Sequence, residues 1–375
     1  MHAVRDVIIA GGGLAGLTAA LHLLRAGLHV TVIEKHPYPR HKVCGEYISN
    51  EVLPYLQWLD ADPAVLHPAS IDRVCISAIS GRTIEAVLPL GGFGISRYAL
   101  DNFLMQKAIA AGCTLLQDAV SNISCSNGIF RVNTVANGPL TARFVIGAYG
   151  KRSALDLELS RDFAWQRSPW MAVKGHYEGD FPDGLVALHN FDGGYCGVSK
   201  IEKDIINICY LVNAESFKKY KNITAHQQEV LYKNRHLKQV FENSRLLFER
   251  PLSISQISFS DKKKVEEHVL MTGDTAGLIH PLCGNGMAMA IHSARIAAEH
   301  IIACNAGQIS RPQLEKGYTK AWQRHFAGRM QAGRLLSAVF HQRRLATAVM
   351  NGLTLFPPLL PVIIRQTHGK PLKMQ

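Results

Sequence analysis

The feature that most constrains the fold is a glycine-rich turn between two apolar stretches near the start of the sequence. Residues 7–10 form an apolar run, and Gly11, Gly13 and Gly16 follow it in G-x-G-x-x-G spacing. A helical pattern comes next, and a second apolar run ends on Glu34. A strand, a tight glycine turn, a helix and a second strand in this order are typical of a dinucleotide-binding βαβ unit. The alternative is a glycine-rich turn in some other α/β protein.

Each part of this motif has a physical role in holding a dinucleotide. Gly11 allows the turn off the strand, Gly13 lets the backbone approach a pyrophosphate, and Gly16 lets the helix pack against the strand. The helix N-terminus offers free N–H groups and a partial positive charge to the phosphates. Glu34 can accept hydrogen bonds from ribose hydroxyls, which favours an unphosphorylated ribose, as in FAD or NAD. We expect three neighbouring residues to belong to the same site: Leu14, Ala15 and Lys35.

The composition agrees with a globular protein large enough for two domains. The chain has 375 residues, of which 47% are hydrophobic and 19% charged. Its eight cysteines form no C-x-x-C pair, which predicts free thiols in a reducing cytoplasm and no metal site. The net charge of +12 suits an anionic cofactor, a nicotinamide nucleotide or an acidic membrane surface. No nucleic-acid-binding motif accompanies this charge, so we expect no nucleic-acid partner.

Periodicity and turn signals predict the elements that follow. We expect a helix at about 50–59, a hairpin of strands at 71–78 and 83–88, a flexible loop at 90–95 and a helix at 97–111. Short strands between 170 and 260 predict an antiparallel sheet, with one helix at about 225–243 and a strand at 252–259. A buried strand at 268–272 then leads through Gly273 and Asp274 to a helix ending near 304, and the remainder is helical.

These elements predict an α/β fold with a Rossmann-like FAD-binding or NAD-binding domain, an inserted antiparallel-sheet domain and a helical C-terminus. The nucleotide-binding domain comprises residues 1–70, 95–160 and 266–310. The sheet domain, expected to bind the substrate, comprises residues 71–94 and 161–265. Residues 311–375 form the C-terminal helices.

Four separated motifs together resemble flavoproteins of the para-hydroxybenzoate hydroxylase and geranylgeranyl reductase superfamily. They are the glycine motif with Glu34, the Lys42-Val43-Cys44-Gly45-Glu46 loop, Arg97 with Asp101, and residues 273–287. The resemblance covers nearly the whole chain, and the Cys44-Gly45-Glu46 loop is more similar to the reductase branch than to the hydroxylase branch. The last motif decides between the two dinucleotides, because NAD-linked dehydrogenases lack it.

The resemblance implies that FAD is the cofactor. It implies that Asp274 holds the ribitol, that N–H groups near Gly286 and Met287 face the N1/O2 edge of the flavin ring, and that Arg97 lies near the diphosphate. A helix N-terminus at that edge would stabilise the negative charge of reduced flavin. Three more residues are expected to contact the cofactor through these motifs: Cys44, Gly273 and Gly284. Arg40 could hold a phosphate or could be an ordinary surface charge.

The sequence departs from the superfamily pattern at two positions. Hydroxylases carry an Asp-Gly pair where this chain has Tyr149-Gly150, so docking of NAD(P)H stays open. Flavin-dependent halogenases carry a Trp-x-Trp-x-x-Pro signature, whereas residues 194–199 contain no tryptophan. This second departure disfavours halogenation.

The function implied is an FAD-dependent oxidoreductase that acts on a hydrophobic small molecule of polyketide, aromatic or isoprenoid type, with NAD(P)H as electron donor. Two chemistries fit: hydroxylation with oxygen, as in a monooxygenase, and double-bond reduction with a side chain supplying the proton. The candidates for that proton donor are Cys44, His280 and Cys283. The alternatives are a flavin-dependent halogenase and a non-enzymatic flavin-binding electron carrier. The substrate, the choice between NADH, NADPH and a protein donor, and the oligomeric state stay open.

The apolar segment at residues 345–364 has about the length of a membrane span. Three prolines would break its helix hydrogen bonding in lipid and Asn351 adds a polar group, which argues against a spanning helix. One alternative is two short helices packed over the substrate domain. The other alternative is that the protein is cytoplasmic and attaches peripherally to the inner membrane face. In that case four cations would meet anionic headgroups: Arg343, Arg344, Arg365 and Lys370.

Overall fold

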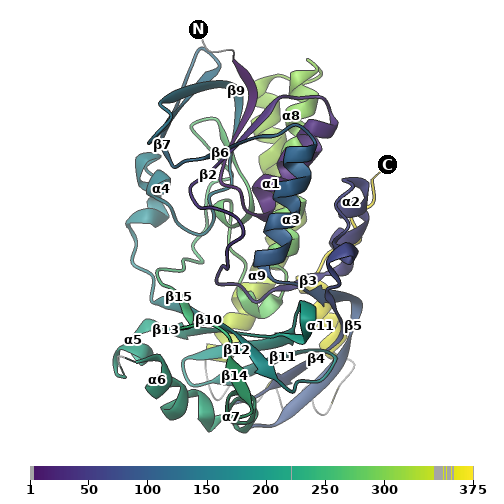
Figure 1. Ribbon diagram of the computed structural model, residues 1–375, viewed down its shortest axis with the longest axis vertical. Helices are drawn as coiled ribbons and strands as arrows, with labels where there is room; N and C mark the ends of the chain where they lie inside the picture. Colours follow the sequence, from purple (N-terminus) through teal and green to yellow (C-terminus); the bar gives the residue numbers. More distant parts are fainter. Residues whose placement is uncertain are drawn as a thin grey trace.

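A computed structural model describes residues 4–220, 222–341, 349, 352, 356 and 359–374. Figure 1 shows two sheets, one in each half of the molecule, with the long helix α9 (Arg311–His341) reaching from the upper half to the lower. The mixed α/β fold expected from the sequence is confirmed, and a second sheet made largely of middle-chain strands accompanies the nucleotide-type sheet.

The upper sheet has the strand order β16-β17-β9-β1-β2-β6, in which every pair is parallel except β16 with β17. Its bounds are β1 Arg5–Ala10, β2 Val30–Glu34, β6 Thr114–Gln117, β9 Pro139–Gly147, β16 Val265–Glu266 and β17 Val269–Met271, with the hairpin β7 Val120–Ser126 and β8 Ile129–Thr134 attached to β9. β1 pairs in parallel with both β2 and β9. The apolar run at the end of β1 is fully buried, as a parallel strand covered on both faces requires.

Three helices of the upper half pack together: α1 (Leu14–Arg25), α3 (Arg97–Ala110) and α8 (Gly286–Asn305). Gly16 permits the close approach of α1 to β1, because a Cβ there would lie 2.0 Å from the carbonyl oxygen of Gly11. Gly11 itself has φ +109°, and a Cβ there would lie 2.4 Å from the carbonyl oxygen of Ala148. The turn therefore has the shape of a nucleotide-binding turn.

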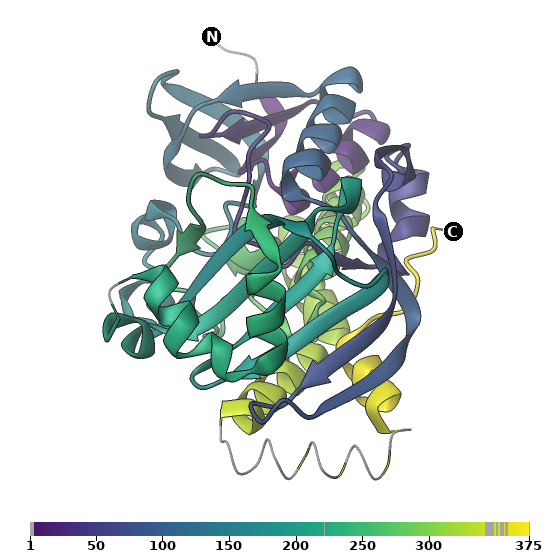
Figure 2. The same cartoon turned by 60° about the horizontal axis from the view of Figure 1, so that its bottom comes forward.

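The lower sheet has the strand order β14-β10-β13-β12-β11-β4-β5-β3, and β15 also pairs with β10. Its bounds are β3 Tyr47–Ser49, β4 Ala69–Ser77, β5 Thr83–Gly94, β10 Trp170–Gly179, β11 Gly184–Phe191, β12 Gly194–Lys200, β13 Ile206–Asn213, β14 Ser244–Leu246 and β15 Leu252–Ile254. All pairs are antiparallel except β4 with β11. Figure 2 shows three helices in front of this sheet: α5 (Ala214–Lys218), α6 (Ile223–Glu229) and α7 (Arg235–Glu242).

The prediction of a flexible loop at residues 90–95 is wrong, because β5 continues to Gly94 and pairs with both β3 and β4. Its glycines allow close packing. A Cβ on Gly92 would lie 2.4 Å from the ring of Tyr47, and a Cβ on Gly94 would lie 1.9 Å from the carbonyl oxygen of Lys200. The extension of this strand is therefore explained by contacts with distant segments, which the local sequence does not reveal.

Three other predicted elements have different extents. The helix predicted at 225–243 is divided into α6 and α7 by a 3₁₀ turn, and Asn234 starts α7 by accepting a hydrogen bond from the N–H of His236 (3.0 Å). The strand predicted at 252–259 is confined to β15. The helix predicted at 50–59 begins as a 3₁₀ turn before α2 (Leu53–Trp58). The remaining short elements are α4 Ala154–Glu158 and 3₁₀ turns at Asn50–Val52, Pro63–Leu66, Asp162–Trp165, Glu202–Asp204, Leu231–Lys233, Gly273–Thr275 and Pro281–Cys283.

The C-terminal helix α11 (Leu359–Thr367) packs on β5 and α9. Leu360 and Ile364 are buried with Ile71, Val74 and Leu88 of the lower sheet, so the predicted packing over this sheet holds for α11. Within the described part of the chain, no helix is both long enough and apolar enough to cross a membrane. The predicted roles of Arg343, Arg344, Asn351, Pro357 and Pro358 fall outside the described residues.

Candidate functional site

Two helices of the upper half begin without a capping side chain. The N-cap residue of α1 is Gly13 and that of α8 is Asn285; neither makes a side-chain cap hydrogen bond, and neither first turn contains an acidic residue. By contrast, Ser96 caps α3 and Ser153 caps α4. The first N–H groups of α1 and α8 are therefore available to an anionic or electron-rich ligand.

The N-terminus of α1 faces two cations. A Cβ on Gly13 would lie 3.5 Å from Arg97 Nη2 and 3.9 Å from Lys42 Nζ, so a glycine leaves room between the helix end and these groups. Arg97 donates from Nε and Nη2 to the two carboxylate oxygens of Asp101 (2.7 and 2.8 Å), and Lys42 Nζ also donates to Asp101 (2.8 Å). Burial would raise the pKa of Asp101, but Arg97 and Lys42 outweigh it and lower that pKa. One buried carboxylate thus holds two cations at a helix N-terminus, which suits a diphosphate.

Glu34 reaches the glycine turn from the end of β2. Its Oε2 accepts a hydrogen bond from the N–H of Gly12 (2.9 Å), and its Oε1 accepts one from the N–H of His36 (3.1 Å). Tyr38 donates its hydroxyl to the carbonyl oxygen of Gly12. Burial raises the pKa of Tyr38, so this hydroxyl stays protonated and keeps donating. Sequence reasoning missed Tyr38, whose only signal was a loop position after Glu34.

Other predicted residues lie around this corner in different environments. Leu14 and Ala15 are buried in the first turn of α1, and Lys35 is exposed. Arg40 is half-buried, and its buried Nε has no hydrogen-bond partner in the described structure. Arg40 therefore keeps a free donor, as a phosphate contact would need.

The second glycine loop meets the first beside α1. Gly273 has φ +59°, its N–H donates to Ser293 Oγ (2.8 Å), and a Cβ on it would lie 3.1 Å from the Cβ of Ala15. Lys262 Nζ donates to the carbonyl oxygen of Asp274 (2.8 Å) and fixes the backbone of this loop. The structure thus brings Gly273 and Asp274 to the same corner as the glycine motif.

The N-terminus of α8 is set by a buried amide. Oδ1 of Asn285 accepts a hydrogen bond from Arg329 Nη1 (2.9 Å), and the same nitrogen donates to Glu51 Oε1 (3.0 Å). The Nδ2 of Asn285 is buried without a partner in the part of the chain that the structure describes. Gly284 precedes this end with φ +61°, and Met287 is buried in the first turn. The helix end keeps unused donors for a ligand, so these residues fit a flavin ring.

The Lys42–Glu46 loop is fastened by Glu46, which is completely buried. Its Oε1 lies 2.5 Å from Lys174 Nζ and accepts the N–H of Arg97 (2.7 Å), and its Oε2 lies 2.7 Å from His176 Nε2. Burial would raise the pKa of Glu46, but Lys174 and His176 outweigh it and lower that pKa. Asn207 Nδ2 also donates to the carbonyl oxygen of Gly45 (2.8 Å). The loop is therefore tied both to α3 and to the lower sheet.

Sequence reasoning missed Lys174, His176 and Asn207. The available signal was a lysine and a histidine inside the otherwise apolar stretch of β10, where unpaired charges are rarely buried. Their partner Glu46 lies more than a hundred positions away, so nothing local identifies the network.

The three candidate proton donors lie in different surroundings. Cys44 is half-buried in the fastened loop, and burial raises the pKa of the Cys209 thiol to about 12. His280 is buried, with its ring 5.0 Å from that of Phe259 and 5.8 Å from that of Tyr195. Cys283 is buried against α9, and burial raises its pKa to about 12.

An apolar cluster lies at the junction of the two halves, close to these candidates. It contains Tyr195 and Leu211 of the lower sheet and Leu278 of the second glycine loop. Val43, the neighbour of Cys44, packs against it, and so does Leu282. A hydrophobic substrate would find apolar partners here, next to both predicted cofactor loops.

Tyr149 occupies the position that carries aspartate in the hydroxylases. The hydroxyl of Tyr149 lies 3.6 Å from Met271 Sδ and 3.4 Å from Arg161 Nη1, and Arg161 pairs with buried Asp156 (2.8 Å). The tyrosine is thus engaged with the upper sheet. Within the described residues, no group of three or more His, Cys, Asp or Glu could hold a metal ion.

Comparison with known proteins agrees with this geometry. The family model described as "FAD dependent oxidoreductase" matches residues 6–45, which contain the glycine motif and Glu34. The chain is 23% identical over 344 residues to the digeranylgeranylglycerophospholipid reductase of Methanosarcina acetivorans, covering 86% of this chain and 81% of that protein. The chain is therefore similar to FAD-dependent oxidoreductases.

The chain is also similar to halogenases. It is 22% identical over 357 residues to the tryptophan 2-halogenase of Chondromyces crocatus, covering 85% of this chain but only 65% of the halogenase. A triple mutant of a flavin-dependent brominase has the same fold, with a TM-score of 0.80, 18% identity, and coverage of 97% of this chain and 94% of the brominase. The relatives therefore include both reductases and halogenases.

Proposed function

We propose that this FAD-dependent oxidoreductase reduces a double bond of a hydrophobic small molecule, with NAD(P)H as the electron donor. The observation that carries the proposal is the fastened loop of Cys44. Glu46 ties this loop to α3 and to the lower sheet, and the adjoining Val43 packs into the apolar cluster at the junction. A thiol held rigidly between a cofactor corner and an apolar surface is suited to deliver a proton to a bound substrate.

The glycine motif, with the cations beside it, would hold the cofactor's diphosphate. The N–H groups at Gly13, Leu14, Ala15 and Gly16 would serve with Arg97 and Arg40, while Glu34 and Lys35 would lie at the adenosine ribose. Gly11 would shape the turn, because its N–H already donates to the carbonyl oxygen of Ile33 (2.8 Å). Gly273 and Asp274 would hold the ribitol, and Gly284, Gly286 and Met287 would face the flavin ring. The fit is supported by the open space at Gly13 and by the unused amide donor of Asn285.

In the proposed reaction the two carbons of the double bond receive a hydride and a proton. FAD, when bound, supplies the hydride, and NAD(P)H restores its reduced form. Cys44 would hold the proton, with His280 as the second candidate because it lies beside the same apolar cluster. Cys283 is the weakest candidate of the three, since it is packed against α9 and burial raises its thiol pKa.

Halogenation is the second candidate function, supported by the halogenase relatives and their fold. Oxygen-dependent hydroxylation is the third. Both need oxygen, and halogenation also needs a halide ion. Double-bond reduction needs neither, so the three reactions can be separated without knowing the natural substrate.

The test uses reduced protein mixed anaerobically with a panel of unsaturated isoprenoid alcohols. Under the proposal, at least one compound reoxidises the flavin without oxygen and gains two hydrogens by mass spectrometry. The same panel is then run with oxygen, and with oxygen and bromide. Products that appear only with oxygen, or only with oxygen and bromide, would contradict the proposal in favour of hydroxylation or halogenation.

We also propose that the protein works in the cytoplasm with peripheral contact to the inner membrane face through its C-terminal segment. Val362 and Arg365 of α11 support this, because the valine is exposed beside a cation. Flotation with anionic liposomes that weakens with salt is the expected result. Equal flotation with neutral liposomes, or no flotation, would contradict it.

A further inference from the structure

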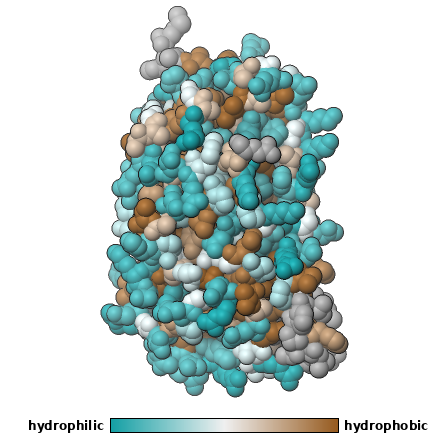
Figure 3. All heavy atoms as spheres, turned by 90° about the vertical axis from the view of Figure 1, so that its right-hand side faces the viewer, coloured by the Kyte–Doolittle hydropathy of each residue, from teal (hydrophilic) through white to brown (hydrophobic). Residues whose placement is uncertain are grey.

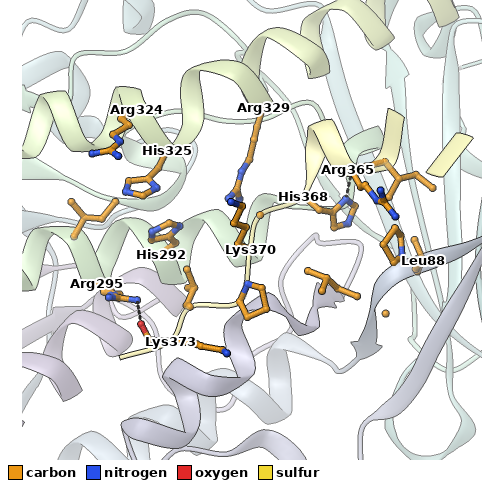
Figure 4. A pocket seen from close by; sticks show the side chains of 18 of the residues that line it. Leu88, His292, Arg295, Arg324, His325, Arg329, Arg365, His368, Lys370 and Lys373 are labelled. Atoms are coloured by element: carbon orange, nitrogen blue, oxygen red, sulfur yellow. Dashed lines mark hydrogen bonds between the residues drawn. The ribbon is translucent and has the colours of Figure 1, made fainter. Parts of the chain in front are cut away.

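A cavity of about 730 Å³ lies between α8, α9, the end of β5 and residues 368–373 (Figure 4). Its size is that of a small-molecule site. Tyr47 lines the cavity, and on its other side the ring packs against Gly284, whose Cβ would lie 3.2 Å from it. The ring of Tyr47 thus separates this cavity from the loop that leads into α8.

The lining carries a large excess of positive charge. Figure 4 shows cations converging from α8, from α9 and from the C-terminal segment. Six Arg and Lys side chains line the cavity, against the single carboxylate of Glu299: Arg295, Arg324, Arg329, Arg365, Lys370 and Lys373. Arg295 is paired with Glu299 (2.7 Å) and Arg329 with Glu51 (3.0 Å). Across the described chain, none of the other four has a carboxylate within ion-pair distance, so an anion with more than one charge would be attracted.

Three buried polar atoms on the lining lack partners in the described part of the chain: the hydroxyl of Tyr47, Nδ1 of His292 and Nε2 of His368. Tyr47 is 8% exposed and His292 is 6% exposed, yet the Tyr47 hydroxyl and the His292 Nδ1 have no hydrogen-bond partner among the described residues. Burial, followed by His325, Arg329 and Arg295, lowers the pKa of His292 to about 3. Buried polar groups are normally satisfied, so these atoms indicate that a ligand supplies the missing partners.

The rest of the lining is apolar. Leu88 and Leu90 come from β5, Ile296 from α8 and Ile364 from α11. On the face turned toward the viewer in Figure 3, hydrophobic side chains gather in the lower half among hydrophilic ones. A ligand with only an anionic group would pair with the cations but would leave the apolar part of the lining without a contact.

We propose that the cavity binds the phosphate group of a phosphorylated amphiphile, with the apolar chain lying against the leucines and isoleucines. A phosphate monoester carries up to two negative charges on three oxygens, so it can accept hydrogen bonds from several of the cations and from unpartnered donors of the lining. The phosphate could belong to a membrane lipid or to a soluble amphiphile. This site is separate from the flavin site and does not depend on the reaction proposed above.

Calorimetric titration of the FAD-loaded full chain with a short-chain phosphatidic acid, kept monomeric, tests the proposal. The variant carries Arg324→Gln and Lys370→Gln, which removes two cations that have no carboxylate partner in the described structure. The matched control carries Lys218→Gln and Lys219→Gln on the exposed helix α5, which changes the net charge equally. Thermal unfolding and FAD content verify that both variants fold.

We expect phosphatidic acid to bind the wild type and the control alike, and to bind the cavity variant at least about tenfold more weakly. Inorganic phosphate and a short-chain phosphatidylcholine should each bind at least about tenfold more weakly than phosphatidic acid. Equal affinity of the cavity variant, or equal binding of inorganic phosphate or phosphatidylcholine, would overturn the proposal. Flotation with phosphatidic acid vesicles then identifies the source: flotation of the wild type and the control that is lost in the cavity variant supports it with a membrane lipid, and binding of the monomer alone supports it with a soluble amphiphile.

Discussion

The uncapped N-termini of α1 and α8 differ in the charges placed around them. At α1, Arg97 and Lys42 stand beside the helix end and share the buried carboxylate of Asp101. At α8 the neutral amide of Asn285 stands at the helix end, and its guanidinium partner Arg329 is paired with Glu51. Full cations suit the fixed charges of a diphosphate, whereas helix N–H groups and an amide suit a ring whose charge changes with reduction. We therefore expect the N-terminus of α1 to bind the diphosphate and the N-terminus of α8 to face the ring that is reduced.

The largest effect should come from Gly13→Val, which closes the α1 end. The backbone at Gly13 is extended (φ −88°, ψ −171°), so valine fits the fold, but its branches would occupy the space before Arg97 and Lys42. We expect folded, colourless protein, measured as flavin released per chain after acid precipitation. Gly328→Val is the control, since a Cβ there meets nothing within 4 Å. A yellow Gly13→Val protein would break the assignment of α1.

The next largest effect is expected for Cys44→Ala, which tests whether the Lys42–Glu46 loop takes part in the reaction. If Cys44 supplies the proton, turnover should fall by about 10²–10⁴, the usual contribution of a positioned acid. FAD content should stay normal. Cys125→Ala, a half-buried thiol on β7, should change neither quantity. A fall of less than about threefold would make Cys44 a packing residue.

Asp101→Asn tests the ion pairs that hold Arg97 and Lys42 at the N-terminus of α1. Removing one partner of a buried ion network costs about 3–5 kcal/mol of unfolding free energy. Asp72→Asn, whose side chain is 70% exposed beside Arg73, should cost about 1 kcal/mol or less. Chemical denaturation measures both. Equal costs for the two variants would mean that Asp101 does not organise this corner.

The pH dependence of the same pair has a definite sign. Because the folded-state pKa of Asp101 is lowered, its stabilising contribution is complete above the unfolded pKa of about 3.9 and is lost as pH falls through the folded value. The wild type should therefore lose stability below about pH 4 more steeply than Asp101→Asn. Parallel curves would contradict the network.

The smallest effect is expected for Asp274→Ala, which tests the ribitol site expected between the N-termini of α1 and α8. The ribitol would lose a charged acceptor, worth about 1.5–3 kcal/mol of FAD binding free energy. Fluorescence titration of apoprotein with FAD gives the dissociation constant. Asp180→Ala, at an exposed position directly after β10, is the control. An unchanged constant for Asp274→Ala would remove Asp274 from the site.

The upper half was predictable because its signals are local. Gly11, Gly13, Gly16 and Glu34 lie within 24 residues, and each acts through backbone geometry that the sequence states directly. The network around Glu46 was not predictable, because its partners come from β10 and from α3. The extension of β5 through Gly94 was missed for the same reason, since its glycines serve contacts made by distant segments.

A crystal structure of the FAD-loaded protein tests the central claim most directly. The account predicts the diphosphate within hydrogen-bond distance of the N–H groups after Gly13, and the N1/O2 edge of the ring at the N–H groups of Gly286 and Met287. A flavin whose diphosphate lay away from α1, or whose other edge met α8, would contradict it.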